Sequence, residues 1–163
     1  MAALASIDRG ESIAVAVGTS QDKQQREGGE IVRGADLCYQ HTMDLLEELG
    51  FPKGVMPLKD LVECGLVRST GFVWMNLKAP YEHFFKGTGT RVSYAKEVTA
   101  YVEKGRMKKM TGVKSKNMLL WVPIVEMSSL KDGRKIYFKT SVGIGRSFPT
   151  SAFEEEEANK GEQ

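Results

Sequence analysis

After Pro57 the chain alternates between short segments that favour β-strands and turns that favour hairpins. The predicted strands cover residues 61–68, 71–77, 82–87, 91–103, 106–110, 118–127, 135–141 and 145–148, with turns at 69–70, 87–90, 104–105 and 132–133. Pro123 lies in the longest apolar run and predicts an edge position or a β-bulge there, because proline cannot donate to the ladder. Closely spaced strands with no helix between them predict a mainly β fold. We expect an antiparallel β-barrel-like domain, or a sandwich, rather than an α/β fold.

One N-terminal α-helix is predicted over about 35–49. Apolar or small side chains recur there at helical spacing, at Cys38, Thr42, Leu45, Leu46 and Leu49. Gly50 and the following Phe51-Pro52 end the helix, because glycine accepts the left-handed conformation and proline cannot continue a helix. This helix is expected to pack against one opening or face of the sheet.

The length of 163 residues predicts one domain, over 34–153. Residues 1–33 are expected to form a flexible N-terminal tail and residues 154–163 a disordered acidic C-terminal tail. Residues 18–29 and the C-terminal segment are polar and have no periodic apolar residues, so they cannot bury enough surface to offset the entropy of ordering them.

Charge is distributed unevenly along the chain. The net charge is −5 over residues 1–50, +11 over 51–150 and −4 over 151–163, which together give the total of +2. A basic centre favours anionic partners, and its densest part is formed by Lys104, Arg106, Lys108, Lys109, Lys114 and Lys116. These residues could meet an anionic membrane surface or an acidic protein, or they could be solvated strand faces that discourage aggregation. Nucleic acid is not expected, because no aromatic stacking platform is interleaved with the lysines.

Catalytic and metal-binding patterns are few. No G-x-S-x-G elbow is present, so we predict no catalytic residue. For an ester hydrolase, the candidate general base is His83 and the candidate nucleophiles are Ser69, Ser93 or Ser147. The residue types in Cys38, His41, Cys64 and His83 suit zinc, but their spacing matches no usual zinc pattern. No metal and no cofactor are therefore predicted.

Large aromatic residues in the strands are core residues or the lining of a ligand cavity. A small barrel lined by such side chains could hold an apolar molecule. The predicted lining residues are Trp74, Phe84, Trp121 and Phe138.

Six segments resemble the plant domain-of-unknown-function 538 family. They are FPKGVMPL at 51–58, RSTGFVW at 68–74, VSYAKEV at 92–98, GRMKKMTGVK at 105–114, LLWVPIVE at 119–126 and SFPTSAF at 147–153. The resemblance covers about residues 35–153 and implies a land-plant protein with an N-terminal helix and a β-barrel-like domain. It carries over no catalytic residue. The family's proposed roles are the binding of lipids or other amphipathic molecules, and chlorophyll binding or ester hydrolysis under stress.

Together these observations predict a non-catalytic module that binds a hydrophobic or amphipathic small molecule such as a lipid or pigment. An ester hydrolase acting on such a ligand and a protein-binding regulator with a basic surface are the alternatives. Many family members begin with a secretory signal, whereas here the apolar run at 13–17 is short and follows Asp8, Arg9 and Glu11. We expect a cytoplasmic protein, which could also associate peripherally with a membrane, since no stretch is long and apolar enough to span one.

Overall fold

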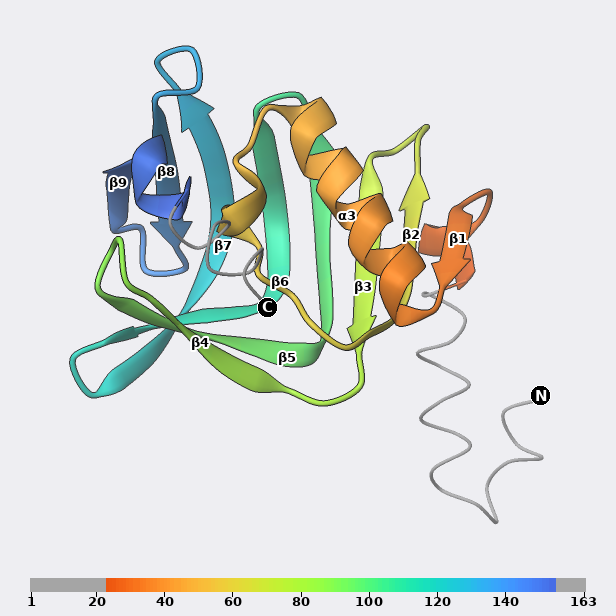
Figure 1. Cartoon of the computed structure of the whole chain (residues 1–163), viewed down its shortest axis with the longest axis horizontal. Helices are drawn as coiled ribbons and strands as arrows, with labels where there is room; N and C mark the ends of the chain where they lie inside the picture. The colour runs from red at the N-terminus through yellow and green to blue at the C-terminus, as the bar shows by residue number, and fades with distance from the viewer. Residues whose placement is uncertain (1–22, 155–163) are drawn as a thin grey trace.

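The computed structural model describes residues 23–154, in which one antiparallel sheet of nine strands organises the chain (Figure 1). In chain order the elements are β1 (Glu30–Arg33), α3 (Ala35–Leu49), the 3-10 helix η1 (Lys53–Val55), β2 (Leu61–Val67), β3 (Phe72–Leu77), β4 (Tyr81–Phe85), β5 (Thr90–Glu103), β6 (Arg106–Asn117), β7 (Leu120–Leu130), β8 (Lys135–Thr140), β9 (Gly145–Pro149) and the 3-10 helix η2 (Thr150–Phe153). The prediction of a mainly β, antiparallel and barrel-like fold is confirmed.

The sheet curls because its long central strands are bent. Its order is β1-β2-β3-β5-β6-β7-β8-β9, with β4 beside the first half of β5 and β3 beside the second half. The β5–β6 register shifts between Tyr94 and Thr99, where Gly112 approaches the backbone closely. A Cβ atom on Gly112 would lie 2.3 Å from the carbonyl oxygen of Glu97. Such bulges bend strands, and the sheet becomes barrel-like without closing, since β1 and β9 are its two ends.

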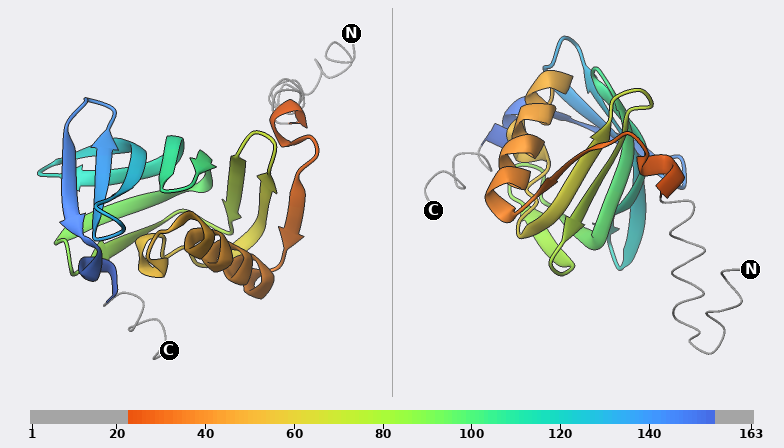
Figure 2. Two further views of the ribbon diagram at one scale, coloured as in Figure 1. Left: turned by 90° about the horizontal axis from the view of Figure 1, so that it is seen from above. Right: turned by 90° about the vertical axis from the view of Figure 1, so that its right-hand side faces the viewer.

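Helix α3 lies against the inner face of the sheet near β1 and β2 (Figure 2). It buries Cys38, Thr42, Met43, Leu46 and Leu49, so the helical spacing in the sequence marks the face that packs. Gly50 is left-handed at φ 88°, and the N–H of Phe51 donates to the carbonyl of Leu46 at 2.9 Å. The predicted helix and its end are confirmed.

The ordered fold begins earlier than predicted. The predicted tail over 1–33 is wrong at its C-terminal end, because β1 pairs with β2 from Glu30↔Leu66 to Arg33↔Glu63. Before β1, Arg26 packs on the outer face of β3, over the indole ring of Trp74 at 4.7 Å. A single strand of four residues with one half-buried side chain has no periodic signal, so its pairing is visible only in the sheet. The remaining tail residues, 1–22 and 155–163, lie outside the described part of the chain.

Two predicted strands have different bounds. Strand β6 continues past residue 110 to Asn117, and the apolar run 118–127 is divided by a hairpin whose two turn residues are Met118 and Leu119. Asn117 pairs with Leu120 across this turn, and Met118 is left-handed at φ 59°. Pro123 lies in β7 between β6 and β8, opposite Lys114 and beside register shifts on both sides. The bulge alternative for Pro123 is therefore confirmed, and the edge alternative is wrong.

Candidate functional site

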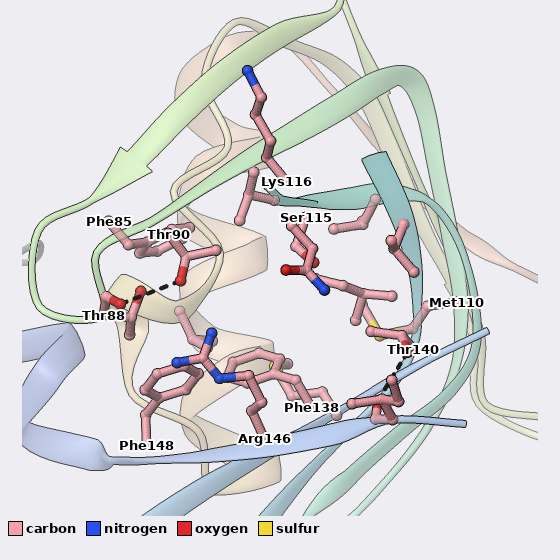
Figure 3. Close-up of a pocket in the computed structure, with 18 of the residues that line it drawn as sticks. Phe85, Thr88, Thr90, Met110, Ser115, Lys116, Phe138, Thr140, Arg146 and Phe148 are labelled. Atoms are coloured by element: carbon pink, nitrogen blue, oxygen red, sulfur yellow. Dashed lines mark hydrogen bonds between the residues drawn. The ribbon is translucent and has the colours of Figure 1, made fainter. Parts of the chain in front are cut away.

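A cavity of about 150 Å³ opens between the ends of β4–β9, on the inner side of the sheet (Figure 3). Its floor is apolar, with contributions from Met110, Val113, Met127, Phe138 and Phe153. Polar lining residues near its mouth are Thr88, Thr90, Ser115, Asn117, Thr140 and Arg146. The cavity therefore combines an apolar interior with a polar opening, as small-molecule sites commonly do.

Strand alternation explains which side chains face this cavity. On β9, Arg146 pairs with Phe138 and Phe148 pairs with Ile136, so these side chains share the inner face. Ser147, between them, shares the outer face with Tyr137. Arg146 and Phe148 are not among the site residues predicted from the sequence. Their spacing of two residues in a predicted strand is the signal that could have found them.

Arg146 is the cation that points into the cavity. Its guanidinium lies over the ring of Phe148 at 4.9 Å and faces Thr88 and Thr90 across the opening (Figure 3). Lys116 also borders the cavity, but its ammonium group points away and lies over the ring of Trp121 at 5.8 Å. Within residues 23–154 no acidic side chain lines the cavity or forms an ion pair with Arg146. A guanidinium without a carboxylate partner is suited to a carboxylate, sulfate or phosphate group of a ligand.

The hydroxyl groups at the mouth are partly used within the protein. Thr90 Oγ1 donates to the carbonyl of Thr88 at 3.3 Å, and Thr140 Oγ1 donates to the carbonyl of Ile144 at 2.8 Å. These bonds hold the β4–β5 and β8–β9 turns in shape around the opening. Ser115 points toward the centre of the cavity (Figure 3).

The four predicted lining residues are not brought together. Phe138 lines the cavity. Phe84 is on the outer face of β4 under Arg91, at 5.6 Å, and Trp121 pairs with Lys116 on the outer side of the β6–β7 hairpin. Trp74 has no exposed surface and packs with Val67, Phe72 and Tyr101 in a second cluster, on the opposite face of β3 from the main core.

The six predicted anion-binding residues are spread along a strand rather than gathered in one patch. Lys104 is in the turn at one end of β6, while Lys114 and Lys116 are near the other end, close to the β6–β7 turn. Arg106 pairs with Glu126 at 3.0 Å and Lys108 pairs with Glu103 at 2.8 Å. Lys109 lies over the ring of Tyr101 at 5.5 Å. Of the six, only Lys116 borders the cavity, and Lys114 faces a separate hollow that Glu82 and Ser93 also line.

The candidate hydrolytic residues lie apart. His83 shares the inner face of β4 with Tyr81 and packs edge-on against Phe85 at 4.6 Å, and Glu82 and Phe84 face outward, as the predicted alternation requires. Ser69 is in the β2–β3 turn, and Ser147 is on the outer face of β9. Ser93 pairs with Glu82, so it lies on the face of the sheet opposite to His83. No hydrogen bond joins any of these three serines to His83 in the described chain.

Cys38, His41 and Cys64 meet where α3 covers β2. Cys64 Sγ lies 3.6 Å from His41 Nδ1, and Cys38 Sγ donates to the carbonyl of Val32 at 3.3 Å. Burial, followed by contact with Cys38, raises the pKa of the Cys64 thiol from 9.0 to about 12. His83 is not part of this group, and among residues 23–154 no cluster of histidine, cysteine and acidic side chains is arranged to hold a metal ion.

Comparison with known proteins supplies the family. A family model described as "Protein of unknown function, DUF538" matches residues 42–154, from within α3 to the end of η2. The chain belongs to the DUF538 family. The DUF538 match thus includes every strand that lines the cavity. No curated protein and no solved structure matches the chain. In the part of this DUF538 protein that the structure describes, no helix is long and apolar enough to cross a membrane.

Proposed function

We propose that this DUF538 protein is a non-catalytic module that binds a small amphipathic molecule, with the ligand's anionic group at Arg146 and its apolar part in the barrel-like cavity. The observation that carries the proposal is the guanidinium of Arg146, which points inward at the polar mouth of a cavity whose floor is apolar. Binding is favoured by the apolar area that the ligand would bury.

The size of the cavity narrows the class of ligand. An apolar cavity of this volume is comparable to one that holds benzene, so it suits an alkyl segment or a single ring. A pigment macrocycle would require the hairpins around the mouth to move apart. Among the ligands expected from the sequence, a fatty acid or another single-chain anionic lipid fits best.

Isothermal titration calorimetry with octanoate, and with octanol as its uncharged counterpart, tests the proposal. We expect the protein to bind octanoate more tightly than octanol. In Arg146→Gln this preference should fall about tenfold, the low end of the about 1.5–3 kcal/mol that a hydrogen bond to a charged group contributes, because Arg146 is exposed to solvent at the mouth. Arg134→Gln is the matched control, because Arg134 is an exposed arginine in the β7–β8 turn and away from the cavity.

A second variant tests the location of the apolar part. Met110 lines the cavity, so Met110→Phe should reduce the affinity for both octanoate and octanol while thermal unfolding stays cooperative. The proposal is abandoned if the unmodified protein binds neither molecule, or if Met110→Phe binds both as well as the unmodified protein does.

A further inference from the structure

Exposed apolar side chains gather around the cavity mouth. We define the mouth hairpins as residues 83–92, 113–123 and 138–147, which contain the β4–β5, β6–β7 and β8–β9 turns. All three contribute to the cavity lining and lie at the end of the sheet remote from β1 (Figures 1 and 2). Ten large apolar side chains are exposed in the described chain, and six of them are in these hairpins: Phe84, Met118, Leu119, Leu120, Val142 and Ile144.

The β6–β7 hairpin is the most exposed of the three. Met118 and Leu119 are 88% and 89% exposed at its turn, although both are large and apolar. Across the β8–β9 turn, Val142 and Ile144 are 67% and 60% exposed, and both also border the cavity. Clustered exposed apolar residues mark an interaction surface, and here that surface is continuous with the cavity opening.

The charges of the mouth hairpins identify the kind of partner. Each hairpin contains two basic residues and no acidic one: Lys86 and Arg91, Lys114 and Lys116, and Lys139 and Arg146. Glu82, just outside the first hairpin, pairs with Arg91 at 3.8 Å. The apolar tips are thus surrounded by positive charge, which is complementary to anionic lipid headgroups.

The order of side chains along the β6–β7 hairpin matches the layers of a bilayer surface. Met118 and Leu119 form the tip, and the next pair on the outer face is Lys116↔Trp121, with the ammonium group over the indole. Tryptophan favours the headgroup level of a membrane, and lysine can extend its ammonium group to that level. Exposed apolar side chains favour the boundary between headgroups and acyl chains.

We infer that the mouth hairpins bind an anionic phospholipid bilayer, with the tip formed by Met118 and Leu119 inserted and the cavity opening held against the lipid. Bilayer binding would let a single-chain lipid enter the cavity without crossing water. This role in ligand transfer rests on the proposed function. Binding to the bilayer itself is a separate event and can be measured without any cavity ligand.

The two tryptophans provide the measurement. Trp121 is beside the tip, whereas Trp74 is fully buried at a distant position, so a change in emission on adding vesicles reports on Trp121. We expect phosphatidylserine-containing phosphatidylcholine vesicles to shift the emission to shorter wavelength. Vesicles of phosphatidylcholine alone should bind much more weakly, and added salt should weaken the binding by screening the headgroup charges. Trp121→Phe should remove the signal but not co-sedimentation with vesicles.

Paired variants distinguish the contribution of the hairpin tip to vesicle binding from that of other exposed side chains. Met118→Ser with Leu119→Ser should reduce vesicle partitioning at least about tenfold, whereas Leu37→Ser with Val62→Ser, two exposed apolar positions on α3 and β2, should not change it. Lys114→Gln with Lys116→Gln should reduce partitioning by up to about thirtyfold, since each basic residue near the surface contributes about a factor of five. Lys104→Gln with Lys135→Gln, away from the mouth, is the charge-matched control.

Several outcomes would overturn the inference. They are absence of binding to phosphatidylserine vesicles, equal binding to vesicles without phosphatidylserine, and equal losses in the tip and control variants. Self-association that the tip variant abolishes in the absence of lipid would assign the surface to a second copy of the chain instead. Octanoate affinity distinguishes the two proposals: the tip variant should keep it, and Met110→Phe should lose it while still binding vesicles.

Discussion

Gly65 lies directly beneath the indole ring of Trp74, so close that a Cβ atom there would be 2.2 Å from Cζ2 of the ring. The two residues face each other across β2 and β3 in register. Trp74 Nε1 donates to Glu63 Oε2 at 2.8 Å, which fixes the ring in this position. The absence of a side chain at Gly65 is therefore what admits a tryptophan to the outer face of the sheet.

Replacing Gly65 by alanine should lower the free energy of unfolding by about 1–3 kcal/mol, because the indole must leave its position to avoid the new methyl group. Urea denaturation measures the change. Combining Gly65→Ala with Trp74→Leu should cost less than the sum of the single variants, since the smaller side chain removes the clash. Strict additivity would show that the two residues do not interact in this way.

Arg26 covers the other side of Trp74 and pairs with Glu97 at 2.5 Å. Arg26→Ala should therefore expose the indole, and we expect greater acrylamide quenching of Trp74 in a Trp121→Phe background. The free energy of unfolding should fall by about 1–2 kcal/mol, in line with a partly buried cation–π contact and ion pair. Arg33→Ala is the control, because Arg33 is mostly exposed and bonds to the same Glu63 without touching the ring. If acrylamide quenches Trp74 fluorescence equally in the two variants, Arg26 does not shield Trp74.

The raised pKa of Cys64 makes stability depend on alkaline pH. The folded thiol has a pKa of about 12 and the unfolded thiol one of 9.0, so the unfolded state loses its proton first as pH rises. The stability associated with Cys64 should be fully present below about pH 9 and should decline as pH rises from there toward 12. Unfolding at about pH 8 and about pH 10.5 should show a smaller decline in Cys64→Ala than in the unmodified protein.

Tyr81 should make a second contribution to the alkaline decline in stability, one that does not depend on Cys64. Burial also raises the pKa of Tyr81, which donates to the carbonyl of Pro57, so part of the alkaline decline should persist in Cys64→Ala. If Cys64→Ala and the unmodified protein have the same pH dependence, the thiol does not contribute.

Met127 is almost fully buried and lines the cavity. Met127→Ala should lower the free energy of unfolding by about 2–5 kcal/mol, because the cavity enlarges and apolar contacts are lost. Under the proposed function, saturating octanoate should recover part of this loss in calorimetric melting. Leu130→Ala, at an exposed position on the same strand, should change stability by less than about 0.5 kcal/mol. A melting temperature that octanoate leaves unchanged would contradict ligand binding near Met127.

Local sequence signals were sufficient to predict most of the helices, strands and turns. The helix at Ala35–Leu49 ends at a left-handed Gly50. The predicted hairpin turns at 104–105 and 132–133 each contain a glycine with a positive φ. These features could be predicted because each depends on residues adjacent in sequence. Strand β1 has no such signal and forms only because β2 offers it an edge. The apolar run 118–127 was misread as one strand because apolar character normally indicates burial, whereas Met118 and Leu119 are exposed at a turn.

Site residues were harder to predict for the same reason. Phe138 was found because large aromatic residues in strands commonly face an interior, yet the same rule also selected Trp74, which is buried on the other face of β3. Arg146 was missed, because a charged residue in a short strand is ordinarily assigned to the outer face. Which face of a curled sheet surrounds a cavity depends on register and bulges, and these arise from pairing between distant segments.

The helix over 35–49, the antiparallel β character, the basic centre and the DUF538 membership follow from the sequence, since propensity, spacing and charge are properties of local segments. Three relationships are visible only in the folded sheet: β4–β9 surround a cavity, Arg146 faces into it, and Met118 and Leu119 lie beside its mouth. Those relationships join hairpins that are separated along the chain, and only the bending and pairing of the sheet bring them to one end.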